Sequence, residues 1–83
     1  MTSKITSHIT MGNGETSDDT LARLLATQHE RAVFKASHQT RAPYLWLTLT
    51  VPHGVGDCEV RDMARRLESA GAHVDVRQSG KRR

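Results

Sequence analysis

The stretch from Tyr44 to Val51 constrains the fold more than any other part of this chain. Its aliphatic residues are separated by single residues that carry a ring or a hydroxyl group: Leu45, Leu47, Leu49 and Val51 against Tyr44, Trp46, Thr48 and Thr50. Side chains alternate between the two faces of a strand, so this period of two predicts a β-strand with one aliphatic face. That face has to be buried, and the chain must supply a second layer to cover it.

Two segments carry the helical pattern that a covering layer requires. The first helix is predicted over residues 18–30, where Ser17 serves as the N-cap and leucines follow at helical spacing. The second is predicted over residues 57–70, with Asp57 as the N-cap, an apolar stripe along one side and Gly71 at the end. Both helices are therefore amphipathic and suited to cover one face of a sheet.

The remaining elements are shorter. Residues 73–78 alternate and predict a strand, which makes the segment from residue 44 onward a β-α-β crossover with parallel strands. Residues 31–37 are ambiguous between helix and strand. We interpret them as a strand, because the strand at 44–51 needs a partner, and we expect residues 38–43 to be the connecting loop.

These elements predict a small α+β two-layer sandwich in the order α-β-β-α-β. Residues 1–16 offer little to bury, and we expect a flexible tail there. If residues 4–10 instead pair as a strand, the order becomes β-α-β-β-α-β, the ferredoxin-like plan. We place a single domain at residues 17–78 and a basic tail at residues 79–83.

Composition narrows the class of protein. The 83 residues allow one domain, and 12 Lys and Arg against 9 Asp and Glu give a mildly basic net charge of +3. Most of the cations are arginines, which form forked contacts with phosphate or carboxylate, although a GC-rich genome produces the same bias. Cys58 is the one cysteine, so no intramolecular disulfide forms. With no signal-like or membrane-spanning apolar stretch, we expect a cytoplasmic protein.

The non-aliphatic side of the strand at 44–51 is the expected binding surface. Two helices suffice for one face of the sheet only, so a face with Tyr44 and Trp46 is left bare. A hydroxyl and several cations are predicted to accompany these rings: Thr48, Arg31, Lys35, Arg41 and Arg77.

Three interpretations of this face stay open. Rings among cations stack bases and attract phosphates, which favours RNA, although the usual motif of the sheet-based RNA-recognition domain is absent. The same residue types are enriched in interfaces, which suits a protein partner or a homodimer. In the third interpretation the N-terminal segment folds over the face and covers it.

His38 is the best single candidate for catalysis. It lies in a segment with nearby cations, from Lys35 to Arg41, and histidine can act as a general base toward an RNA 2′-hydroxyl. A solvated loop histidine without a role is the alternative. The five histidines show no pair at ligand spacing and there is no second cysteine, so we expect no metal, and we expect no cofactor.

Residues 21–71 resemble the HicA-type toxins, small mRNA-cleaving proteins of bacterial toxin–antitoxin pairs. The resemblance is carried by a helix, a turn, a strand end and a closing helix: Leu24-Leu25, Lys35-Ala36-Ser37-His38, Thr50-Val51-Pro52-His53-Gly54 and Arg61 to Gly71. It implies a ribonuclease with His38 as the catalytic residue, RNA as the substrate and an antitoxin as the partner. Ala36 replaces the turn glycine of the family, and the strand predicted at 73–78 departs from the family plan.

Taken together, these features predict a small bacterial regulatory or mobile-element binding module. Its aromatic and basic sheet face would bind RNA or a protein partner. A HicA-like ribonuclease and a phage-type inhibitor or adaptor that acts as a dimer are the alternatives.

Overall fold

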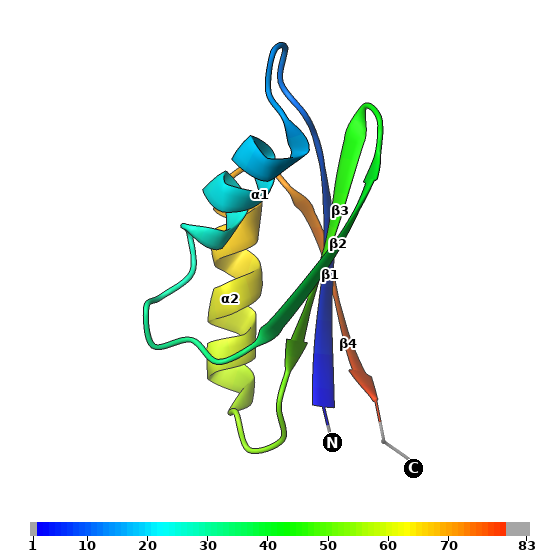
Figure 1. Ribbon diagram of the computed structural model, residues 1–83. Helices are drawn as coiled ribbons and strands as arrows, with labels where there is room; N and C mark the ends of the chain where they lie inside the picture. The colour runs from blue at the N-terminus through cyan, green and yellow to red at the C-terminus, as the bar shows by residue number, and fades with distance from the viewer. Residues whose placement is uncertain (1, 80–83) are drawn as a thin grey trace.

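A computed structural model describes residues 2–79 and confirms the α+β two-layer architecture. Its elements follow the order β-α-β-β-α-β: β1 (Thr2–Thr10), α1 (Ser17–Leu25), β2 (Lys35–Arg41), β3 (Tyr44–Val51), α2 (Asp57–Ser69) and β4 (His73–Ser79). The strands form one antiparallel sheet in the order β2-β3-β1-β4. Both helices lie on the same face of this sheet, and the other face is open (Figure 1). The ferredoxin-like alternative is therefore the observed plan.

The N-terminal segment is where the structure corrects the sequence prediction most strongly. The flexible tail expected at residues 1–16 is wrong for Thr2–Thr10, which form β1 at the centre of the sheet. Ile5 and Ile9 are buried in the core, and Ser7 between them is fully buried. The Ser7 hydroxyl donates a hydrogen bond to the Leu47 carbonyl oxygen at 3.3 Å. Pairing with a strand on each side, together with the burial of two isoleucines, therefore stabilises β1 in the sheet.

The crossover from β3 through α2 to β4 has the predicted orientation. Both strands run antiparallel to β1, which lies between them, so β3 and β4 are parallel to each other without being neighbours. The helix predicted at 57–70 is observed at Asp57–Ser69, and its N-cap is Gly56 rather than Asp57.

The first helix and β2 deviate from the predicted bounds. The helix expected to reach residue 30 ends at Leu25, where the Thr27 hydroxyl donates to the Leu24 carbonyl oxygen at 2.7 Å. The strand expected at 31–37 begins only at Lys35 and runs on to Arg41, so most of the predicted loop at 38–43 is strand. All seven residues of β2 are exposed. A strand without a buried side chain shows no alternation of apolar and polar residues, so the sequence pattern does not predict its bounds.

A short network around Glu15 joins β1 to α1. The Glu15 Oε1 atom accepts hydrogen bonds from the Gly12 N–H at 3.0 Å, from the buried Thr20 hydroxyl at 2.9 Å and from Arg23 at 3.0 Å. These donors lower the pKa of Glu15 below its ordinary value of 4.5, the Gly12 N–H first and the Thr20 hydroxyl second. Thr16, rather than the predicted Ser17, is the N-cap, and it forms a capping box with Asp19.

The hydrophobic core lies between the sheet and the helices. The aliphatic face of β3 is its centre, because Leu45, Leu47 and Leu49 are fully inaccessible to solvent. From the helices, Leu24 and Leu67 close over them with no exposed surface. Each such leucine contributes roughly 1.5–3 kcal/mol through burial, so this layer contributes strongly to the stability of the domain. Neither helix within residues 2–79 is long and apolar enough to cross a membrane.

Candidate nucleic-acid interface

The open face of the sheet is built from rows of directly opposed residues. In an antiparallel sheet opposed residues point to the same face, and successive rows lie about 7 Å apart along the strands. From β2 across to β4, the two central rows are Gln39–Trp46–His8–His73 and Ser37–Thr48–Thr6–Asp75. The outer rows are Arg41–Tyr44–Thr10 and Lys35–Thr50–Lys4–Arg77. Side chains from all four strands therefore form one continuous surface.

Three rings lie stacked in a line across this face. The His8 ring stacks on Trp46 with centroids 4.5 Å apart and on the other side meets His73 at 5.0 Å, with interplanar angles of 30° and 24°. Tyr44 meets His8 edge-on at 6.1 Å. Trp46 and Tyr44 keep 37% and 43% of their surfaces exposed. Both faces of the His8 ring are covered by Trp46 and His73, so stacking with a planar ligand falls to Trp46, His73 and Tyr44. We call His8, Tyr44, Trp46 and His73 the ring platform.

Charge is divided unequally between the two layers. The four strands hold the cations Lys4, Lys35, Arg41 and Arg77 and a single carboxylate, Asp75. By register, all five lie on the open face. The other eight acidic residues of the chain belong to the helices and loops. The open face is therefore cationic although the whole chain is only mildly basic.

A shallow depression of about 500 Å³ lies beside the ring platform. It extends from the rings toward the row of cations and is lined mainly by Lys4, Thr6, His8, Trp46, His73, Asp75 and Arg77. The Arg77 Nε atom donates to Asp75 Oδ2 at 3.1 Å, which places a carboxylate and a guanidinium together at its rim. Aromatic rings and hydrogen-bonding groups therefore line the same depression.

The structure brings most of the predicted binding residues to this face. Tyr44, Trp46 and Thr48 lie on it from β3, as the alternation predicted. Lys35, Arg41 and Arg77 join them from the two edge strands: Lys35 and Arg41 from β2, Arg77 from β4. These positions follow from the sheet register alone.

Arg31 and His38 lie elsewhere. Arg31 precedes β2 in an irregular segment and lines a hollow beside α2 with His29 and Cys58, so its predicted place on the sheet is wrong. His38 is in β2 rather than in a loop, and it lies opposite Leu47, on the face away from the ring platform. The surface that holds the rings and cations therefore does not include His38, whose catalytic role stays a prediction of the HicA resemblance.

Two contributors from β1 were missed by sequence reasoning. His8 is the middle ring of the platform, and Lys4 completes the row of cations with Lys35 and Arg77. Their signal was the period of two in Lys4, Thr6 and His8, opposite in phase to Ile5 and Ile9. The serine- and threonine-rich composition of this segment favoured a flexible tail instead, so this alternation was not used to predict a strand.

The comparisons with known proteins leave the site to be argued from its own geometry. No protein-family model matches the chain, and no curated protein matches it. Among residues 2–79, no group of three His, Cys, Asp or Glu side chains is arranged to hold a metal ion.

Proposed function

We propose that this protein binds single-stranded RNA across the open face of its sheet. The observation that carries the proposal is the ring platform, which lies exposed between cations on a face that holds one carboxylate. Bases stack on such rings whatever their sequence, and lysine and arginine compensate the phosphates between them. The same face would select a strand with unpaired bases over a duplex, because the rings need the flat side of a base.

The layout of the rows supports this ligand over a folded protein surface. Trp46, on β3, and His8, on β1, lie on the two central strands, where an extended chain that crosses the sheet must pass. The sheet-based RNA-recognition domains stack two or three bases on aromatics of this kind. Lys4 and Arg77 lie two rows, about 14 Å, from the ring row, so charge and stacking act on different nucleotides.

Stacking is expected to supply most of the affinity. Each stacked base contributes about 1–3 kcal/mol, judged by alanine substitution, and the platform offers Trp46 and Tyr44 as its largest rings. The cations add a salt-dependent contribution, which is distinguishable because it weakens as salt is added.

A titration of single-stranded RNA into the protein, followed by Trp46 fluorescence, tests the proposal directly. Trp46 is the only tryptophan of the chain, so quenching reports on the ring platform alone. We expect quenching at low salt, with an apparent Kd that rises as salt is added. No change in fluorescence and no mobility shift of a labelled 12-mer at low salt would overturn the proposal.

A matched pair of charge reversals locates the bound strand. Lys35→Glu changes a cation on the open face, and Arg31→Glu makes the same change in net charge on the α2 side. We expect Lys35→Glu to weaken binding severalfold and to reduce the salt slope by about one, while Arg31→Glu stays near wild type. Equal losses in both would show non-specific attraction to net charge rather than a site. If this face binds a protein partner and does not bind RNA, added RNA will fail to displace that partner.

A further inference from the structure

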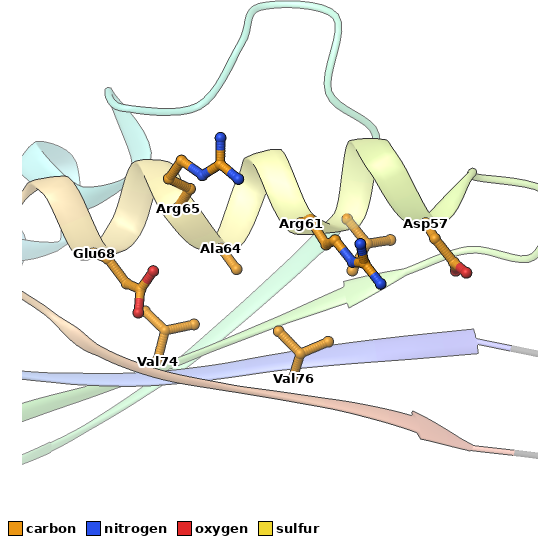
Figure 2. A pocket seen from close by; sticks show the side chains of 8 residues that line it. Asp57, Arg61, Ala64, Arg65, Glu68, Val74 and Val76 are labelled. Carbon is orange, nitrogen blue, oxygen red and sulfur yellow. The ribbon is translucent and has the colours of Figure 1, made fainter.

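A second surface lies where α2 runs alongside the edge strand β4. A groove of about 690 Å³ separates them, with charged side chains along its rim and Val74 and Val76 on its floor (Figure 2). The α2 wall contributes Val60 and Ala64, and the rim carries Asp57, Arg61, Arg65 and Glu68. This groove is on the helix side of the sheet and is distinct from the depression beside the ring platform.

The two edges of the sheet differ in how they are protected against another strand. Edge strands expose unpaired backbone groups, and native proteins guard them with charges and polar side chains. β2 has no large aliphatic residue and carries Lys35 and Arg41 at its ends. β4 also carries two charged residues, Asp75 and Arg77, but between them it presents Val76, which lines the groove with 39% of its surface exposed. The β4 edge is therefore the one suited to receive a strand.

We propose that β4 pairs with β4 of a second copy of this chain, antiparallel and about a two-fold axis at Val76. The charges of the strand support this occupant. In that register Asp75 lies opposite Arg77 of the second copy, and Arg77 opposite Asp75 of the second copy. The Asp75–Arg77 ion pair within each chain then gives way to two cross-strand ion pairs that flank a valine pair. The two Val76 side chains then lie side by side on the helix side of the joined sheet, where the floors of the two grooves meet. A strand whose charges complement its own reversed copy is what a symmetric interface requires.

Neighbouring registers are less favourable. An axis at Asp75 would place two carboxylates directly opposite each other, which destabilises a pair of strands. An axis at Val74 would place Val76 opposite Ala72, outside β4, and leave the exposed valine without a strand partner. Of these three registers, only the one centred on Val76 satisfies both the charges and the exposed apolar residue.

The assembly would join two sheets into one of eight strands. A two-fold axis perpendicular to the sheet leaves the helices of both copies on one side and both ring platforms on the other. The two open faces would become one continuous surface. In the groove, Arg61 lies above Val76 and therefore near the axis, where two copies bring like charges together (Figure 2).

Sedimentation equilibrium of the wild-type chain, followed by charge variants, tests this assembly. We expect a concentration-dependent dimer. Asp75→Arg or Arg77→Asp alone should weaken association at least tenfold, and the double variant D75R/R77D should restore it, because the exchanged charges again face each other. A monomer at all concentrations, or no rescue in the double variant, would overturn the proposal.

Two further variants fix the register. Val76→Cys in a Cys58→Ser background should oxidise to a covalent dimer, since an opposed pair has its Cβ atoms close enough for a disulfide. Thr40→Cys on β2 is the matched control and should remain monomeric under the same oxidant. Arg61→Gln should tighten association because it removes the like charges near the axis. A dimer that links through the control and not through Val76→Cys would place the interface elsewhere and overturn the proposal.

Discussion

The two faces of the sheet are made from the same four strands and differ completely in chemistry. On the helix side β3 buries Leu45, Leu47 and Leu49, and on the open side it shows Tyr44 and Trp46. Over the central strands β1 and β3 the first face is mainly apolar and is covered by the helices, whereas the second combines rings with four cations. A period of two thus allows a single short strand to serve stability with one set of residues and binding with the other. The two sets of substitutions should therefore be separable.

The largest effect is expected on the closed face. Leu47→Ala removes a fully buried side chain at the centre of the core and leaves a cavity between the sheet and the helices. We expect a loss of about 2–5 kcal/mol in the free energy of unfolding, measured by urea denaturation. A loss below 1 kcal/mol would contradict the division between the faces.

The next largest effect is expected for a substitution on the open face, which should weaken RNA binding and leave the core intact. Trp46→Ala should weaken RNA binding about tenfold or more, since a stacked base is worth about 1–3 kcal/mol. Because Trp46 is partly exposed and lies outside the core, the urea midpoint should shift less than in Leu47→Ala. Fluorescence anisotropy of a labelled oligonucleotide replaces the lost tryptophan signal. Unchanged affinity would remove the ring platform from the binding surface.

The loss of stability in acid should arise on the helix side of the sheet, from Glu15 just before the start of α1. The pKa of Glu15 is lowered by the Gly12 N–H, the Thr20 hydroxyl and Arg23, so its stabilising contribution is present above pH 4.5 and is lost as the pH falls below that value. Glu15→Gln should lower stability at pH 7 and flatten the decline between pH 5 and pH 3. Thermal unfolding at a series of pH values measures this. A parallel decline in both proteins would show that other carboxylates govern the acid transition.

The smallest effect is expected at His38, which lies on neither the buried core surface nor the ring platform. His38 faces the helix side of β2 and is exposed. His38→Ala should therefore leave the equilibrium constant of unfolding and the affinity for RNA within about twofold of the wild-type values. Expression of the two proteins in growing cells gives an independent readout. RNA loss and growth arrest with the wild type, absent from His38→Ala, would instead support the HicA-like ribonuclease.

How far the sequence predicted this structure depended on burial. β3 and α2 were placed nearly to the residue, because each has one apolar side and one polar side. β2 was misplaced because all of its residues are exposed, so edge pairing rather than hydrophobic pattern determines where it lies. The binding residues on β3 followed from the same alternation that predicted the strand. Lys4 and His8 could not be placed until β1 was known to pair with β3 and β4.

The central position of β1 has a practical consequence for work with this protein. β4 is held to the sheet only through β1, and β3 meets β4 only across it. Trimming the first ten residues, which composition makes look dispensable, would leave a two-stranded hairpin and a detached strand with no shared edge. Shifting β1 by one position would be as damaging, because histidine and threonine would then occupy the core while both isoleucines met water. Expression vectors should therefore preserve this end of the chain intact and carry purification tags elsewhere.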